Sequence, residues 1–234
     1  MLERFEDEYG IEVVHAWGMT EMSPIGSFAQ SKEKHRDAET SVRRAMKVKQ
    51  GRVIPGIDMK IVDGEGMDLP WDGKSAGDLM VRGWWVASAY FKQPPGSALR
   101  DGWFATGDVA TIDADGYMQI TDRSKDVIKS GGEWISSIEL ENIAVGHPAV
   151  AEAAVIGVPH PKWGERPLLV AQLRQGAEVS RDELLAFYRG KTAAWWVPND
   201  VVFVGALPHT ATGKLLKTEL RQRFADYRIP AAPT

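Results

Sequence analysis

The segment TDRSKDVIKSGGEWISSIELEN, residues 121–142, divides the chain into two parts of different character. Five charged side chains fall within eight residues at its start, and a glycine pair follows at 131 and 132. Ser136 precedes Glu139 by three positions, which is the spacing of a capping box and predicts a helix to about Gly146. We therefore expect a boundary between two units near residue 122, with a solvated charged linker as the simpler alternative.

Downstream of this segment the pattern predicts a compact α+β unit. Ser180 and Glu183 repeat the capping-box spacing and predict a helix through Lys191. A last helix is expected over residues 213–227, with Lys214 at its start. The expected order β-α-β-β-α-β-α is typical of an α+β domain. Its strands are predicted from apolar runs at 126–129, 150–158, 167–174 and 199–205.

Upstream of it we expect a piece of an α/β domain followed by a β-rich unit. Leu2, Phe5 and Tyr9 have helical spacing, and IEVVHAW at 11–17 predicts a buried strand. Asp113-Ala-Asp115-Gly116 supplies the residue types of a hairpin turn. The segment could be mistaken for a calcium loop, but the other ligand positions of such a loop are absent. The β-rich unit is predicted from runs between Gly, Pro and Asp clusters at 57–63, 77–83, 103–113 and 116–122.

Composition excludes several classes of protein. The chain has 234 residues, with 28 Lys and Arg against 32 Asp and Glu, and 44% hydrophobic residues. The absence of cysteine excludes disulfide scaffolds, thiolate metal sites and cysteine nucleophiles. The slightly acidic balance argues against general nucleic-acid binding. No apolar run approaches the roughly 20 residues that span a bilayer, and the five histidines show no zinc spacing.

Two segments of the first part carry candidate ligand-binding side chains. WGMTEMSP, residues 17–24, follows an expected strand and exposes Thr20 and Glu21, which can bind a phosphate oxygen and a magnesium ion. Trp17 offers a flat face for a base, although a helix cap and a buried Trp explain the segment equally well. In DGWFATGDVA, residues 101–110, Asp108 can accept hydrogen bonds from both vicinal hydroxyls of a ribose. A hairpin Asp without a ligand is the simpler explanation of that segment alone.

Two segments of the second part also indicate chemistry. In LPHTATGKLLK, residues 207–217, Lys214 follows a glycine and can point toward a polyphosphate. The segment is not a P-loop, because Leu215 stands where Ser or Thr is required. Trp134, just after the glycine pair, suits a loop that presses against another surface. Taken singly, a surface lysine and a charged linker are the simpler explanations.

Together and in this order, these motifs resemble one family: the adenylate-forming acyl-CoA synthetases, luciferases and non-ribosomal adenylation domains. The resemblance extends from Val13 to Tyr227, and DRSKDVIKSGGEWISSIELEN, PHPKWGERP and PHTATGKLLK resemble the medium- and long-chain fatty-acyl-CoA synthetases in particular. The fold it implies has two parts. Residues 1–122 would end a large α/β plus β-barrel AMP-binding domain, with its α/β piece over about 1–50, and residues 123–234 would form a small mobile C-terminal domain.

The resemblance implies a two-step reaction that uses ATP and coenzyme A as co-substrates and Mg²⁺ as a cofactor. A fatty acid and ATP give an acyl-adenylate and pyrophosphate, and the thiol of coenzyme A then displaces AMP. By resemblance, Trp17 lies beside the adenine, Thr20 contacts the phosphate that becomes AMP and Glu21 binds Mg²⁺. Asp108 would bind the ribose hydroxyls, and Arg123 would support the ribose or phosphate. Lys214 would bridge carboxylate and phosphate, Lys125 takes the hinge position, and the pantetheine channel would be lined by Gly131, Gly132 and Trp134.

The family's Gly/Ser/Thr-rich phosphate loop and most of its acyl pocket belong before the WGMTEMSP segment. We therefore expect the chain to act with an N-terminal portion of the same enzyme and to make no acyl-CoA alone. The alternatives are a non-catalytic interaction module and an aryl- or amino-acid-activating relative. A cytoplasmic location is expected, with peripheral membrane contact left open for an enzyme of fatty acids.

Overall fold

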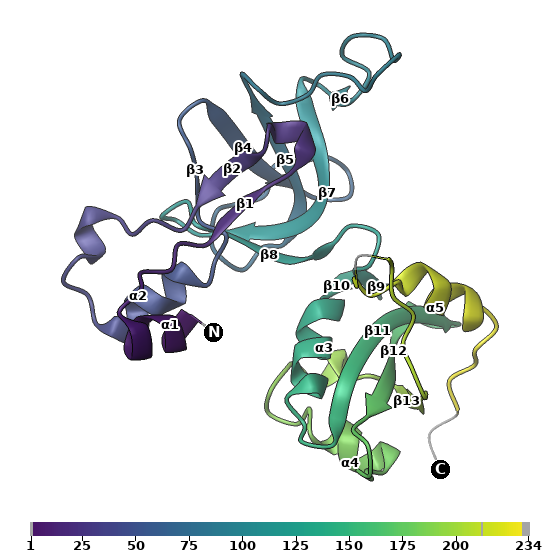
Figure 1. Cartoon of the computed structure of the whole chain (residues 1–234). Coiled ribbons are helices and arrows are strands. Elements are labelled where there is room, and N and C mark those ends of the chain that lie inside the picture. The colour runs from purple at the N-terminus through teal and green to yellow at the C-terminus, as the bar shows by residue number, and fades with distance from the viewer. Residues whose placement is uncertain (1, 212, 231–234) are drawn as a thin grey trace. The chain divides into compact units, whose positions relative to one another are not determined.

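The chain divides into two compact units, Met1–Ser124 and Lys125–Thr234. The computed structural model describes residues 2–211 and 213–230 (Figure 1). The division falls two residues later than the sequence led us to expect, because Arg123 ends a strand of the first unit and lies opposite Asp108 in its ladder. Thr212, inside the segment 207–217, lies outside the described residues.

The first unit opens with a small antiparallel sheet and two helices. Strands β1 (Ala16–Gly18), β2 (Ile25–Phe28) and β3 (Arg52–Val53) pair in that order, a short 3-10 turn (Thr20–Met22) joins β1 to β2, and another (Glu33–His35) follows β2. The helices are α1 (Leu2–Tyr9), as predicted, and α2 (Thr40–Lys47).

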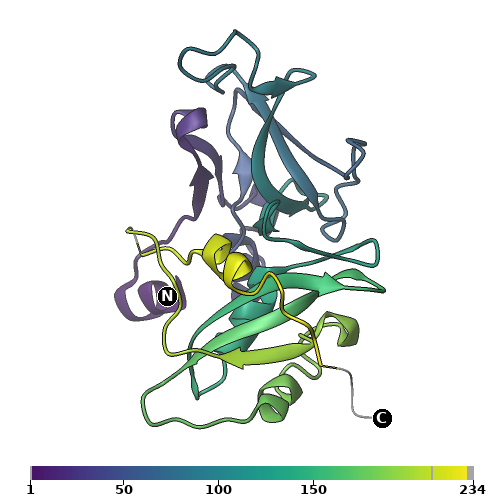
Figure 2. The same cartoon turned by 90° about the vertical axis from the view of Figure 1, so that its right-hand side faces the viewer.

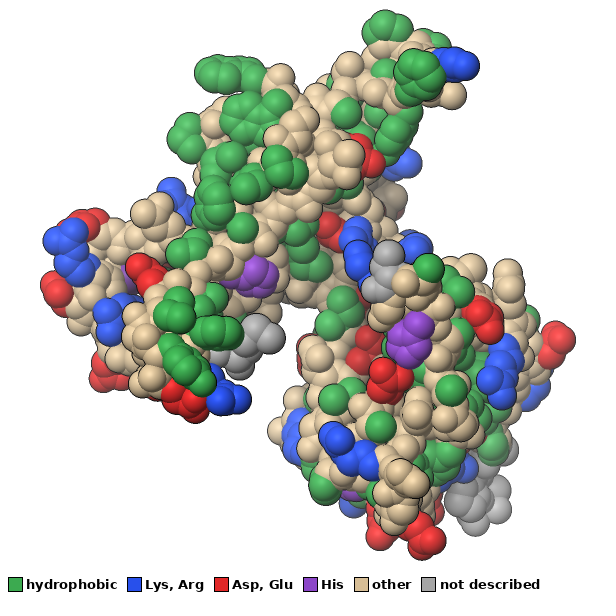
Figure 3. Space-filling view, in the orientation of Figure 1, with side chains coloured by type: hydrophobic (Ala, Val, Ile, Leu, Met, Phe, Trp, Pro, Cys, Tyr) green, Lys and Arg blue, Asp and Glu red, His purple; other side chains and the backbone are tan. Residues whose placement is uncertain are grey.

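The strand expected over residues 11–17 is wrong for most of its length. Only Ala16 and Trp17 of that run pair with β2, and the residues before them have no regular structure. Ile11 and Val14 are each 50% exposed, so the apolar run that suggested a buried strand lies on the surface. Figure 3 shows hydrophobic side chains gathered on the surface of this unit.

The larger sheet of the first unit is antiparallel and curled (Figure 1). Its order is β4 (Ile57–Val62), β5 (Gly77–Gly83), β7 (Trp103–Ile112) and β6 (Leu99–Arg100), and β8 (Met118–Arg123) also pairs with β7. The predicted turn between β7 and β8 is confirmed. Asp113 Oδ1 accepts hydrogen bonds from the amides of Asp115 and Tyr117 at 2.9 and 3.0 Å, and Gly116 has φ +83°. The core of this sheet contains Ile61, Leu79, Ile112 and Met118, which are fully buried.

The second unit is a five-stranded sheet with helices on both faces (Figure 1, and turned in Figure 2). Alternate residues of β11 enter opposite cores, so that Val155 packs with α3 and α4 whereas Ile156 packs with α5. The elements in chain order are β9 (Ile128–Ser130), β10 (Glu133–Ile135), α3 (Ser137–Val145), β11 (Val150–His160), β12 (Gly164–Leu173), α4 (Arg181–Ala186), a 3-10 turn (Ala194–Trp196), β13 (Asp200–Phe203) and α5 (Lys217–Arg223).

Both capping predictions are confirmed, but three details of the second unit differ from the prediction. Ser136 and Ser180 each accept a hydrogen bond from the amide three residues ahead. Helix α4 ends before the predicted Lys191, and strand β10 was missed. Helix α5 begins at Lys217 rather than near Gly213, because the preceding residues fold back into a turn.

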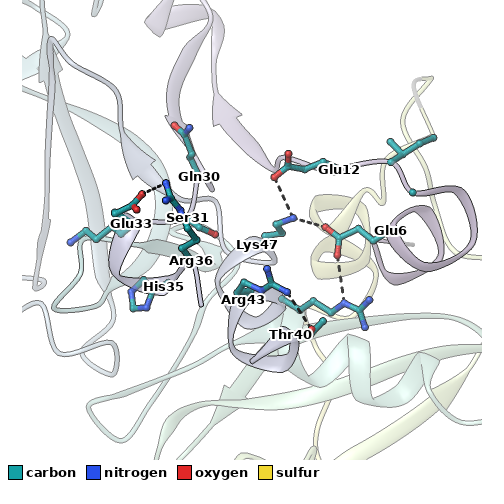
Figure 4. Close-up of a pocket in the computed structure, with 14 residues that line it drawn as sticks. Glu6, Glu12, Gln30, Ser31, Glu33, His35, Arg36, Thr40, Arg43 and Lys47 are labelled. Carbon is teal, nitrogen blue, oxygen red and sulfur yellow. Dashed lines mark hydrogen bonds and ion pairs between the residues drawn. The ribbon is translucent and has the colours of Figure 1, made fainter. Parts of the chain in front are cut away.

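Helices α1 and α2 are joined to each other by charge rather than by a core. Neither helix has a buried side chain. Lys47 Nζ lies 2.5 Å from Glu6 Oε1 and 3.5 Å from Glu12 Oε1 (Figure 4), and Arg44 pairs with Glu6 and with Asp7. Except for Asp7, these charged residues line a pocket of about 560 Å³. Ion pairs of this kind contribute little to stability at partly exposed sites.

We therefore expect residues 2–50 to be the least protected from amide exchange in the first unit. Opening α1 and α2 exposes little apolar surface, whereas opening the β4–β8 sheet disrupts a core. Hydrogen–deuterium exchange followed by mass spectrometry measures the difference. Protection across residues 2–50 equal to that of β5 and β7 would contradict this prediction.

Candidate functional site

Trp17, Asp108 and Arg123 form one cluster in the first unit. Trp17 Nε1 donates a hydrogen bond to Asp108 Oδ2 at 3.1 Å, and Arg123 Nη1 lies 2.7 Å from Asp108 Oδ1. Gly26 of β2 permits the indole to lie close, since a Cβ there would be 2.9 Å from Trp17 Cζ3. These three residues are therefore in contact although they lie 91 and 15 positions apart along the chain. The motifs of the sequence assigned all three to one nucleotide.

The backbone holds Asp108 in this position from two sides. Asp108 and Arg123 are directly opposite in the β7–β8 ladder, where cross-strand side chains lie close enough to pair. Gly107 before it has φ +74°, a conformation that favours glycine. The hydroxyl of buried Thr106 accepts a hydrogen bond from the Asp108 amide at 3.1 Å.

The Asp108 carboxyl is 3% exposed, and this burial raises its pKa. The charge of Arg123 and the hydrogen bond from Trp17 act in the opposite direction but do not cancel the effect. Arg123 itself has a side chain 53% exposed. The cluster therefore contains a buried acceptor beside an exposed cation, an arrangement that suits a hydroxyl-bearing anion such as a nucleotide.

Thr20 and Glu21 lie on the turn that follows β1. Thr20 is exposed. The carboxylate of Glu21 accepts a hydrogen bond from the hydroxyl of Tyr90 at 3.0 Å, and this bond raises the pKa of Tyr90. The backbone carbonyl of Glu21 accepts a hydrogen bond from the amide of Ala87 at 2.8 Å. The sequence analysis missed Tyr90, which lies 69 positions away and carries no motif of its own.

The donor set at this turn fits a magnesium ion that is also held by phosphate. One carboxylate, from Glu21, and one hydroxyl, from Thr20, leave room for water and phosphate oxygens, as Mg²⁺ prefers. Among residues 2–211 and 213–230, no group of three or more His, Asp and Glu side chains gathers as a self-contained metal site.

Lys125 is the first residue of the second unit and is exposed. The residues on either side of it are each fixed to their own unit. Ser124 donates from its amide to Gly107 O at 3.0 Å and from Oγ to Asp78 Oδ1 at 2.5 Å. Arg221 donates to Lys125 O at 2.9 Å and forms an ion pair with Asp126. Ser124 is thus bonded within the first unit, and Lys125 and Asp126 within the second.

Gly131 and Gly132 form the tight turn between β9 and β10, with φ +61° and +90°. Gly131 lies against Trp163, because a Cβ there would be 2.9 Å from the indole. Trp134 follows on β10, partly buried, with Lys129 Nζ 5.4 Å from its ring centre. Beside the turn is a pocket of about 350 Å³, lined by Ser130, Gly131, Glu133, Trp163, Arg166, Trp195 and Asn199.

Two aromatic side chains that line this pocket were not predicted as site residues from the sequence. Trp163 and Trp195 are 42% and 41% exposed. Buried Arg166 fixes the pocket from behind, with hydrogen bonds to Ser130 Oγ at 3.2 Å and to Trp195 O at 2.6 Å. Burial lowers the pKa of Arg166. The signal available in the sequence was the high tryptophan content, nine residues in 234.

Lys214 is exposed in the loop before α5. Its amide donates to Thr210 Oγ1 at 3.1 Å, and its carbonyl accepts from the Thr210 amide at 2.7 Å. Gly213 before it has φ +79°. The structure thus places Lys214 at a tight turn in the second unit, and the candidate nucleotide-binding residues in the first.

Two family models match the chain on either side of the charged segment. Residues 1–91 match the AMP-binding enzyme family, and residues 139–214 match the AMP-binding enzyme C-terminal domain. The fold agrees: MatB from Rhodopseudomonas palustris, solved with ATP bound, superposes with a TM-score of 0.78 at 30% identity over 96% of this chain and 43% of that one. The chain belongs to the adenylate-forming, AMP-binding enzymes.

Within this family the curated relatives include several CoA ligases. The chain is 59% identical over 226 residues to 3-methylmercaptopropionyl-CoA ligase of Ruegeria pomeroyi, covering 97% of the chain and 42% of that protein. It is 50% identical to a medium-chain-fatty-acid–CoA ligase of Ectopseudomonas oleovorans and 42% identical to a long-chain-fatty-acid–CoA ligase of Thermus thermophilus, covering 41% and 42% of their lengths. The chain thus spans less than half the length of these relatives.

A second solved structure supports the same fold assignment. The o-succinylbenzoate CoA synthetase of Bacillus subtilis, in complex with its acyl-adenylate intermediate, superposes with a TM-score of 0.78 at 29% identity, over 99% of this chain and 44% of that one.

Among the described residues, no helix has the length and apolar character needed to cross a membrane.

Replacement of Asp108 by Asn separates binding from stability. A carboxyl whose folded-state pKa is raised adds stability at acid pH that is lost as the pH rises through that pKa. At pH 7 the ionised group therefore opposes folding, and we expect Asp108→Asn to melt no lower than the parent. AMP affinity should fall by about 30-fold, as expected for lost hydrogen bonds to a charged acceptor.

Thermal melts at pH 4 and pH 7, with AMP titration by calorimetry, test both parts of this prediction. The gain in melting temperature of the Asn variant should be greater at pH 7 than at pH 4. A variant that is destabilised mainly at pH 7 and binds AMP normally would show that Asp108 is a structural ion-pair partner only.

Proposed function

We propose that this chain is the C-terminal portion of a fatty-acid–CoA ligase that forms an acyl-adenylate and then an acyl-CoA. The observation that carries the proposal is the contact of Trp17, Asp108 and Arg123 in one cluster. The buried carboxylate can accept both ribose hydroxyls, the indole offers a face to the adenine, and the guanidinium is free on its outer side to meet a phosphate.

In the first half-reaction, a carboxylate oxygen of the acid attacks the α-phosphorus of ATP and pyrophosphate leaves. Negative charge grows on the α-phosphate as the new bond forms, and a fixed cation there lowers the barrier. Lys214 provides a compact charge on a constrained turn, and Thr20 provides a hydroxyl for a phosphate oxygen. Glu21 would hold Mg²⁺, which neutralises charge on the phosphates when bound.

In the second half-reaction, the sulfur of coenzyme A attacks the acyl carbonyl and AMP leaves, while the thiol proton passes to solvent. No nucleophilic side chain is required, since the adenylate is already activated. We propose that the turn at Gly131, Gly132 and Trp134 lines the pantetheine channel. Lys125 is proposed as the pivot between half-reactions, because its neighbours on both sides are fixed.

The substrate class follows from the named relatives rather than from the pocket of this chain. The acids of the relatives at 59%, 50% and 42% identity are a short thioether acid and medium- and long-chain fatty acids, all flexible aliphatic carboxylates. A trans-cinnamate:CoA ligase of Petunia hybrida is 35% identical. An aliphatic acid is therefore favoured over an aromatic one, and a non-catalytic interaction module is the remaining alternative.

A hybrid enzyme tests this proposal. The 226 matched residues of this chain replace the corresponding segment of the Ruegeria pomeroyi ligase, and acid-dependent ATP–pyrophosphate exchange is measured with a panel of aliphatic and aromatic acids. We expect exchange with aliphatic acids and a loss of about 100-fold or more in Lys214→Ala, because a preorganised charge is removed. Lys191→Ala, another exposed lysine of the second unit, is the matched control and should retain exchange.

A folded hybrid without exchange on any acid would support the non-catalytic alternative. Exchange that survives Lys214→Ala would remove that lysine from the proposed chemistry, and exchange confined to aromatic acids would overturn the substrate class.

A further inference from the structure

The loop that carries Lys214 is closed at its base by a short ladder. The amide of Leu216 donates to Pro208 O at 2.8 Å, and His209 and Leu215 form an isolated β-bridge. Leu207, just before the loop, is buried against the core beneath α5. The tip of the loop is exposed, so the position of Lys214 depends on how this base is attached to the rest of the unit.

The C-terminal end of the loop is attached to helix α3 by the buried charge of Lys217. Lys217, the first residue of α5, is 9% exposed, and its ammonium lies 2.6 Å from Glu141 Oε1 and donates to Ser137 Oγ at 2.7 Å. Ser137 and Glu141 are four positions apart on α3, which places them on the same face of that helix. Lys217 is three residues from Lys214 along the chain.

Glu141 also ties this ion pair to the sheet. Its Oε1 accepts a hydrogen bond from the amide of Val155 at 2.8 Å. Strand β11 is the last in its sheet order, so an amide of β11 that is not paired with β12 needs a partner of another kind. One carboxylate oxygen thus joins the edge of β11, helix α3 and the start of α5.

A buried ion pair is a poor source of stability but a strong constraint on position. The free-energy cost of removing both charges from water offsets much of the attraction between them. The pair is favourable only at short distance and with good hydrogen-bond geometry, so it limits where the two side chains can lie. His209 Nε2, 3.5 Å from Glu152 Oε1 of β11, gives the loop a second contact with the same strand.

We propose that Lys217 and Glu141 are positioning residues for Lys214, and that their ion pair sets where the catalytic ammonium is held during adenylation. The inference rests on the proposed function for the role of Lys214. The cation at Lys217 does not touch substrate. It fixes the base of the loop so that the exposed lysine three residues earlier is presented in one orientation.

The first test uses the 234-residue chain and needs no activity. Amide exchange is followed by NMR in Lys217→Met and in Arg223→Met, a matched loss of charge at an exposed position of the same helix. We expect the Thr210 and Leu216 amides to exchange at least about tenfold faster in Lys217→Met only, with β11 and β12 unchanged. Unchanged loop protection, or equal loosening of loop and sheet, would overturn the proposal.

The second test separates the two half-reactions in the hybrid enzyme. Lys217→Met should lower ATP–pyrophosphate exchange by about 100-fold, as a misplaced catalytic group does, but leave CoA transfer from a supplied acyl-adenylate within a few-fold. Lys217→Arg should recover much of the exchange. Equal losses in both half-reactions would show a structural role only.

Where Lys217→Met fails to fold, Glu141→Gln carries both measurements, because its amide oxygen can still accept from Val155. Faster amide exchange in the loop together with loss of ATP–pyrophosphate exchange in that variant supports the proposal, and unchanged values of both overturn it. A hybrid without any ATP–pyrophosphate exchange would count against the proposed function. The amide exchange of the loop would still decide whether Lys217 holds the loop.

Discussion

The first unit is organised around the buried carboxylate of Asp108. A carboxylate removed from water is unfavourable unless it is paired, and here it receives one hydrogen bond from Trp17 and one charge from Arg123. Trp17 comes from β1 of the small sheet, and Arg123 comes from β8 beside Asp108 in the large sheet, so the Asp108 carboxylate links the two sheets. Burial raises the pKa of Asp108 in spite of these two partners, a pattern that is common at functional sites.

In the second unit, the proposed functional residues lie on two turns attached to a packed sheet. These turns are the glycine turn at 131–132 and the loop of Lys214, and helices cover both faces of the sheet. Both turns use positive φ at glycine, and both are fixed at their base by buried polar groups, Arg166 in one and Lys217 in the other. Sites on such supports can be exposed and still precise.

Local signals in the sequence predicted the local structure well. The capping serines at 136 and 180 and the Asp113 turn are confirmed because each depends only on residues within four positions. The buried strand at 11–17 was wrong, because the exposure of Ile11 depends on what the rest of the chain packs against it. The last helix was placed too early, because residues 208–216 close a local turn that no motif in the sequence signals. Tyr90, Trp195 and the Lys217–Glu141 pair were missed because their contacts join residues far apart in the sequence. Trp17, Asp108 and Arg123 were named through motifs and lie in contact, and their role in nucleotide binding stays a prediction.

Binding of the nucleotide by Trp17, Asp108 and Arg123 is tested most directly by an AMP titration followed through the side-chain N–H signals of Trp17 and Arg123. Trp17 donates to Asp108 and Arg123 is ion-paired with it, so ribose hydroxyls that reach this carboxylate must disturb both side chains. The account predicts that these two signals shift together with one dissociation constant, while the indole signal of Trp71, on the same unit, stays in place. Saturable AMP binding that leaves Trp17 and Arg123 unmoved would contradict it.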